Sequence, residues 1–90
     1  MAQVVWTRGA ARDLAAIRIY IAQFSPLAAQ RLAARLVAAA RSLETSPDRG
    51  RPITRDRREL TIIPPYLIRY LHAADRVLIL EIRHGARDPE

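Results

Sequence analysis

The sequence contains no cysteine, no lysine and only two histidines, His72 and His84. Without cysteine, disulfide bridges and thiolate metal sites are excluded. Two histidines that lie 12 residues apart do not supply a structural zinc site, so we expect no metal and no cofactor. The chain also lacks a run of 18 uncharged apolar residues, and its first residues do not follow the pattern of a secretory signal, so we expect none. We therefore expect a soluble cytoplasmic domain without a membrane segment.

The chain has 90 residues, of which 50% are hydrophobic, and this length predicts one small domain at residues 1–90 with a thin core. An enclosed active-site cavity is not expected in so small a domain. All 15 basic residues are arginine against nine acidic residues, which gives a net charge of +6. Such a field suits nucleic acid, the ribosome or an acidic protein. Arginine also binds carboxylate and phosphate groups through two parallel hydrogen bonds. The composition thus predicts an anionic partner.

Hydrophobic spacing and turn residues divide the chain into one strand, two helices and three more strands. Leu14, Ile17 and Ile21 recur at helical spacing after the capping residue Thr7, and Asp13 is expected to favour the start of that helix. Ser25-Pro26 begins the second helix. The fold class is α+β, ordered β-α-α-β-β-β, with an antiparallel helical hairpin on a small, mainly antiparallel sheet. The expected elements are a strand at 3–6, helices at 8–24 and 26–45, strands at 59–63, 66–72 and 76–83, and a polar tail at 85–90.

Alternation along the last two strands predicts which side chains share a face of the sheet. The continuous apolar run at 77–80 indicates a central strand that is covered on both faces. Charged residues among the apolar ones indicate a partly solvated face, which is suited to docking a partner. In the strand at 66–72, one face carries Tyr66, Ile68, Tyr70 and His72, and the other carries Leu67, Arg69 and Leu71. In the last strand, one face carries Leu78, Leu80, Ile82 and His84, and the other carries Val77, Ile79, Glu81 and Arg83.

No catalytic signature is present: there is no glycine-rich phosphate loop, no His-x-x-x-His and no serine or cysteine nucleophile with a partner histidine. Histidine is the side-chain type suited to acid–base chemistry near neutral pH, and His84 lies beside several arginines in the sequence. We favour the simpler interpretation, a strand-end histidine bonded to the backbone of the tail. Arg69 beside two tyrosines is either a functional group or a stacked surface arginine. Arg55, Arg57 and Arg58 indicate a solvated loop that adds to the positive field.

Several short segments occur in a characteristic order along the chain. The most specific are Gly50-Arg51-Pro52, Arg58-Glu59-Leu60 and His84-Gly85-Ala86-Arg87-Asp88, and Tyr66-Leu67-Ile68 lies between the last two. With these segments the chain resembles the RelE/ParE superfamily of toxins from type II toxin–antitoxin modules, and most closely its ParE branch. The resemblance spans about residues 3 to 89 and implies a toxin that arrests bacterial growth. It further implies a cognate, acidic, ParD-like antitoxin that silences the toxin within a hetero-oligomer.

Two mechanisms divide this superfamily: RelE-like members cut mRNA on the ribosome, whereas ParE-like members poison DNA gyrase. Ribonuclease relatives usually carry an arginine where this chain has Leu67 and another directly after the histidine, where it has Gly85. RNA cleavage needs both proton transfer and stabilisation of phosphate charge. These departures favour a gyrase-poisoning binding protein over an enzyme. His84 and Arg87 match the ribonucleases, so an mRNA endoribonuclease acting on the ribosome is the alternative; a third possibility is a member that only binds its antitoxin.

The resemblance and the charge pattern together predict which residues are functional. No residue is predicted to bind a metal. No catalytic residue is assigned to a gyrase poison, while a nuclease would use His84 and Arg87. The candidates for binding the target are Arg58, Arg69, Arg83, His84 and Arg87. The candidates for binding the antitoxin are Leu32, Arg31, Arg35, Arg69 and Arg83.

Overall fold

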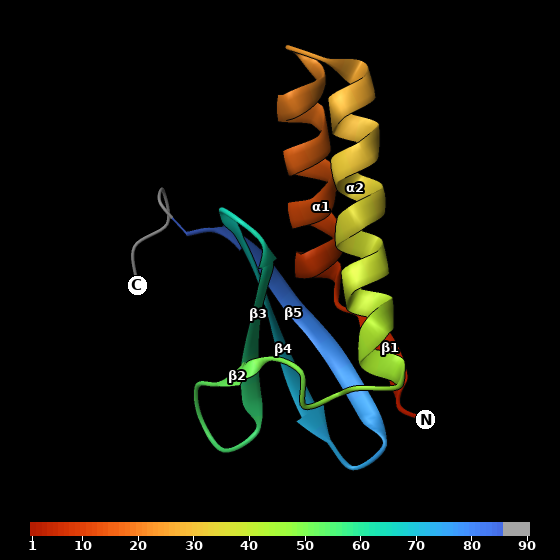
Figure 1. Cartoon of the computed structure of the whole chain (residues 1–90), viewed down its shortest axis with the longest axis vertical. Coiled ribbons are helices and arrows are strands. Elements are labelled where there is room, and N and C mark those ends of the chain that lie inside the picture. The colour runs from red at the N-terminus through yellow and green to blue at the C-terminus, as the bar shows by residue number, and fades with distance from the viewer. Residues whose placement is uncertain (86–90) are drawn as a thin grey trace.

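A computed structural model of the chain describes residues 1–85, except for the side chain of Ile62, and shows a helical hairpin beside a twisted five-stranded sheet (Figure 1). The α+β fold class is therefore confirmed. One hydrophobic core lies between the helices and one face of the sheet, and it includes Leu36, Leu43, Tyr70 and Val77. The elements are β1 (Gln3–Trp6), α1 (Arg8–Ala22), α2 (Pro26–Arg41), the 3-10 turn η1 (Ser42–Glu44), β2 (Arg51–Pro52), β3 (Arg57–Ile63), β4 (Tyr66–Ala73) and β5 (Arg76–His84).

Both helices begin where the sequence predicts, because a hydroxyl caps each of them. Thr7 Oγ1 accepts the Ala10 N–H at 3.2 Å, and Ser25 Oγ accepts the Ala28 N–H at 3.1 Å. Asp13, expected to favour the start of α1, lies beyond its first turn and instead accepts the Ile82 N–H at 3.0 Å. Asp13 therefore joins α1 to the sheet.

The ends of the elements differ from the sequence prediction by a few residues. The first helix ends at residue 22 rather than 24, and the second ends at residue 41, where the chain tightens into η1 instead of continuing to 45. The strand expected at 59–63 begins at residue 57, and those expected at 66–72 and 76–83 each extend by one residue at the C-terminal end. The two-residue strand β2 was not predicted, because it is too short to show alternation.

The sheet has the order β1-β5-β4-β3-β2, with β1 parallel to β5 and all other neighbours antiparallel. The central position of β5 was predicted, but its expected cover on both faces is wrong. Val77 and Ile79 are fully buried, whereas Leu78 and Leu80 on the other face are partly exposed. The reason is that the single helical hairpin covers one face only; we call the other one the open face.

The faces predicted for the last strand are wrong beyond Leu80, because the strand contains a β-bulge at that residue. Arg69 pairs with Glu81 while Tyr70 pairs with Ile79, so Leu80 is an extra residue in β5. The alternation therefore reverses after Leu80: Ile82, 5% exposed, joins Val77 and Ile79 in the core, and Glu81 faces the open side. Along β4 the predicted alternation is confirmed, with Tyr66, Ile68 and Tyr70 buried.

Tyr70 ties the segment after η1 to the middle of the sheet. Its buried hydroxyl donates to the Pro47 carbonyl at 2.7 Å and accepts the Gly50 N–H at 2.8 Å. Arg58 Nη1 donates to the carbonyls of Asp48 at 3.1 Å and Gly50 at 2.8 Å. The turn-rich segment is thus fixed on β3 and β4. Within residues 1–85, neither helix has the length and apolar character needed to cross a membrane.

Candidate functional site

Four charged side chains of alternating sign cross the open face on four neighbouring strands. The strand register places Arg51 beside Glu59, Glu59 beside Arg69, and Arg69 beside Glu81. Arg51 Nη2 lies 2.9 Å from Glu59 Oε1, and Arg69 Nε lies 3.0 Å from Glu59 Oε2. Arg69 Nη1 is 3.6 Å from Glu81 Oε2. We call Arg51, Glu59, Arg69 and Glu81 the charge ladder.

Glu59 is the buried centre of the charge ladder, with 8% of its side chain exposed. Burial by itself raises the pKa of Glu59, but hydrogen bonds and charges from Arg51 and Arg69 outweigh it and hold the pKa below its usual value. Glu59 is therefore ionised at neutral pH. Since Arg69 lies between the carboxylates of Glu59 and Glu81, much of its charge is already compensated. The sequence alone did not predict this arrangement, because it depends on the register of the strands.

The predicted target-binding residues do not gather on one face. Arg83 pairs with Leu67 and shares the open face with Arg69. His84 pairs with Tyr66 on the other face, and their rings meet edge to face with centroids 5.3 Å apart. Arg58 lies with its Nε 3.5 Å from Asp48 Oδ1 and holds the loop before β2. Arg87 lies outside the described residues.

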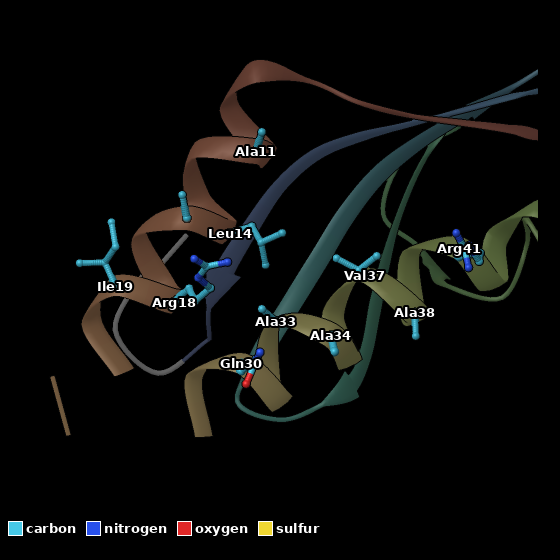
Figure 2. Close-up of a pocket in the computed structure, with 11 residues that line it drawn as sticks. Ala11, Leu14, Arg18, Ile19, Gln30, Ala33, Ala34, Val37, Ala38 and Arg41 are labelled. Atoms are coloured by element: carbon cyan, nitrogen blue, oxygen red, sulfur yellow. The ribbon is translucent and has the colours of Figure 1, made fainter. Parts of the chain in front are cut away.

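An apolar groove lies between the two helices of the hairpin (Figure 2). Its volume is about 670 Å³, and short alanine side chains leave this space open. Ile19 and Val37 line it and are 66% and 41% exposed, respectively. Arg18 and Arg41 add positive charge. We call it the hairpin groove; its lining is Ala11, Leu14, Ala15, Arg18 and Ile19 of α1 with Gln30, Ala33, Ala34, Val37, Ala38 and Arg41 of α2.

The predicted antitoxin-binding residues of α2 do not line the hairpin groove. Leu32 is partly buried and packs against the core, while Arg31 and Arg35 are exposed. All three instead line a smaller depression of about 290 Å³ together with Ser25, Leu27 and Ala28. Sequence reasoning followed the leucine stripe of α2, whereas the alanines at 33, 34 and 38 were the available signal for the groove. In residues 1–85, no three histidine, aspartate or glutamate side chains converge as a metal ion requires.

Comparisons with known proteins agree with this fold over nearly the whole chain. Residues 4–89 match the family described as "ParE toxin of type II toxin-antitoxin system, parDE". Toxin RelE2 of Caulobacter vibrioides is 61% identical over 87 residues, covering 97% of this chain and 99% of the relative. The solved structure "Chromosomal ParDE TA system from P. aeruginosa" aligns with a TM-score of 0.79 and 26% identity, covering 93% of this chain and 96% of that one. The chain therefore belongs to the ParE toxin family of type II toxin–antitoxin systems.

Proposed function

We propose that this toxin arrests growth by binding and poisoning DNA gyrase without catalytic residues of its own. The observation that carries the proposal is the separation of His84 from Arg69 and Arg83, two described arginines of the sheet that could stabilise a phosphate. His84 lies on the helix-covered face against Tyr66, whereas Arg69 and Arg83 lie on the open face. RNA cleavage needs a proton-transfer group and a phosphate-stabilising cation around one bond. The arrangement of these three residues therefore supports binding over cleavage.

The target surface in this proposal is the open face together with the C-terminal end of β5. Arg69 and Arg83 lie there among partly buried leucines, Leu67, Leu71 and Leu78, so the face offers both apolar and charged contacts. His84 and Arg87 would extend the contact at the end of the strand, and Arg58 would act by holding the neighbouring loop. Because gyrase works on bacterial DNA, the proposal places the toxin in the cytoplasm.

The antitoxin of this proposal is an acidic, ParD-like chain that places an amphipathic helix in the hairpin groove. A groove with exposed Ile19 and Val37 and an alanine-rich wall fits the apolar face of a helix. Arg18 and Arg41 at the groove would meet carboxylates of the partner. A partner that continues around α2 would reach Leu32, Arg31 and Arg35 next to Leu27. The solved structure of a chromosomal ParDE system, to which this chain is similar, supports a toxin–antitoxin hetero-oligomer.

The decisive experiment adds purified toxin to gyrase supercoiling reactions and, in parallel, to translation extracts. We expect inhibited supercoiling and trapped cleaved-DNA complexes, with intact mRNA, and we expect the antitoxin to reverse the inhibition. Ribosome-dependent mRNA cleavage without gyrase inhibition would instead establish the alternative function, an mRNA endoribonuclease. That alternative is favoured by the relative named Toxin RelE2.

A further inference from the structure

An arginine-rich loop extends from the sheet at the end of the molecule away from the tip of the helical hairpin (Figure 1). Five of the ten residues at 49–58 are arginine, and one, Asp56, is acidic. We call residues 49–58 the arginine loop; it contains β2, the turn that follows, and the start of β3. Its arginines at 49, 51, 55 and 57 are exposed.

Some arginines of this loop already have a partner within the protein, and others make no ion pair. Arg51 pairs with Glu59, and Arg58 lies near Asp48. Arg49 Nη1 donates to the Ser42 hydroxyl at 2.8 Å. In the described part of the chain, Arg55 and Arg57 make no ion pair with any carboxylate, although Asp56 stands between them in sequence. These two exposed arginines are therefore available to an anionic ligand.

Backbone hydrogen bonds fix the shape of the arginine loop before any ligand binds. The N–H groups of Ile53 and Thr54 both donate to the Arg57 carbonyl, at 2.8 and 3.3 Å. The His72 N–H donates to the Asp56 carbonyl at 2.8 Å, which joins the turn to β4. Because the backbone is already ordered, binding through Arg55 and Arg57 costs mainly side-chain entropy.

We propose that the arginine loop binds the phosphate backbone of duplex DNA. Guanidinium groups match phosphate oxygens in geometry as well as in charge. The arginine loop stands at the edge of the five-stranded sheet, where β2 pairs with β3. A pair of strands can enter the major groove of B-form DNA and reach the phosphates beside it, whereas the major groove of A-form RNA is too narrow to admit protein elements. A protein partner is less well matched, because Ile53 is the one large exposed apolar side chain in the loop.

This inference goes beyond gyrase poisoning, because its ligand is DNA itself and its surface is separate from the hairpin groove. The groove is lined by α1 and α2, whereas the arginine loop belongs to β2 and β3 at the edge of the sheet, away from the tip of the helical hairpin (Figure 1). An antitoxin helix in the groove therefore leaves Arg55 and Arg57 uncovered. The DNA contact does not depend on which enzyme the toxin inhibits.

The test measures binding of the full-length toxin to a fluorescent DNA duplex of about 20 base pairs, by anisotropy, between about 50 and 200 mM salt. Each phosphate contact contributes about 0.9 to the slope of log affinity against log salt. We expect the double variant Arg55→Gln, Arg57→Gln to lower the magnitude of this slope by about 1.8. The matched control is Arg8→Gln, Arg12→Gln, which removes the same charge from exposed positions on α1 and should leave the slope unchanged.

Four outcomes would overturn the proposal. The first is a wild-type toxin that does not bind DNA at about 50 mM salt. The second is an equal loss of affinity in the two double variants, which would mean that net charge alone explains binding. The third is a loop variant that keeps the full slope. The fourth is tighter binding of a matched RNA duplex than of the DNA, which would assign the loop to RNA. Antitoxin binding and thermal unfolding of each variant report its fold, and gyrase inhibition measured in parallel tests the proposed function separately.

Discussion

At the scale of single residues, Gly50 leaves the space in which the Tyr70 hydroxyl binds the loop. A Cβ at position 50 would lie 2.8 Å from both Cε1 and the hydroxyl oxygen of Tyr70, and 3.1 Å from the Glu59 carbonyl. We expect Gly50→Ala to lower the free energy of unfolding by about 1–3 kcal/mol, because a fully buried ring has little room to move. Urea unfolding measures this change.

The matched control for Gly50→Ala is Gly9→Ala. The Cβ at position 9 would meet its nearest atom, the Leu80 carbonyl oxygen, at an ordinary 3.7 Å, and Gly9 lies inside α1. Alanine is favoured over glycine there by up to about 1 kcal/mol. Equal stability of the two variants would contradict the role assigned to Gly50.

The buried carboxylate Glu59 makes stability depend on pH. Its pKa is lowered in the folded state, so its contribution is fully present above the unfolded-state pKa of about 4.3 and is lost as the pH falls through the lower folded-state pKa. We expect Glu59→Gln to cost about 1–3 kcal/mol at pH 7 and less at about pH 3, which lies below the unfolded-state pKa. Urea unfolding at both pH values tests this. Glu81 lies at a more exposed end of the charge ladder, so Glu81→Gln should lower the free energy of unfolding by less. If the effect of Glu59→Gln does not change with pH, the role assigned to the ionised Glu59 is wrong.

Leu67 tests the distinction between gyrase poison and nuclease. It stands where ribonuclease relatives usually carry arginine, and it pairs with Arg83 on the open face. We expect Leu67→Arg alone to create no ribonuclease activity, because His84 would still lie on the opposite face of the sheet. The measurement is mRNA cleavage in a translation extract. Cleavage by this variant would show that the remaining catalytic groups are complete and would favour the nuclease function.

At the scale of elements, the end of β5 combines a predicted binding role with structural contacts. His84 and Arg87 are predicted to bind the target, while the simpler interpretation of His84 is structural. In the structure His84 packs on Tyr66, and the Gly85 N–H donates to the Pro65 carbonyl at 2.8 Å. The structural contacts and the proposed binding role therefore overlap at residue 84.

This overlap predicts different results for two truncations. A chain that ends after Gly85 keeps every contact among the described residues, so we expect an unchanged midpoint of thermal unfolding and reduced toxicity. A chain that ends after Ile82 also loses the pairs Tyr66–His84 and Leu67–Arg83, and we expect a lower midpoint. Circular dichroism and growth assays measure the two effects. Unchanged toxicity of the longer truncated chain would remove the functional role proposed for Arg87.

Features of the fold that depend on nearby residues in the sequence could be predicted. Features that depend on which strand or helix lies alongside could not. Thr7 and Ser25 cap their own helices, so their roles are visible in sequence. The bulge at Leu80 exists only in the pairing of β5 with β4, and it reverses the face of Ile82. The charge ladder likewise depends on strand register. The hairpin groove depends on how α1 and α2 meet: the alanines of the second helix indicated close approach of the two helices, but not the groove between them.

At the scale of the whole molecule, net charge and apolar surface have different effects on antitoxin binding. The charge of +6 acts at a distance and speeds encounter with an acidic partner, whereas the hairpin groove acts only after contact. Exposed ion pairs contribute only about 0.2–1 kcal/mol each. We therefore expect the association rate to fall strongly between low and high salt, while the dissociation rate changes little. Stopped-flow mixing of toxin and antitoxin measures both rates.

Two variants separate these contributions. Val37→Ala removes about two methyl groups from the groove wall, so it should raise the dissociation rate about ten-fold and leave the salt dependence of association unchanged. The pair Arg18→Gln, Arg41→Gln should weaken that salt dependence while changing dissociation less, because both arginines line the groove and are exposed. Association that does not respond to salt would mean that the positive field plays no part in capturing the antitoxin. The excess of arginine would then need another ligand, and the DNA contact proposed for the arginine loop supplies one.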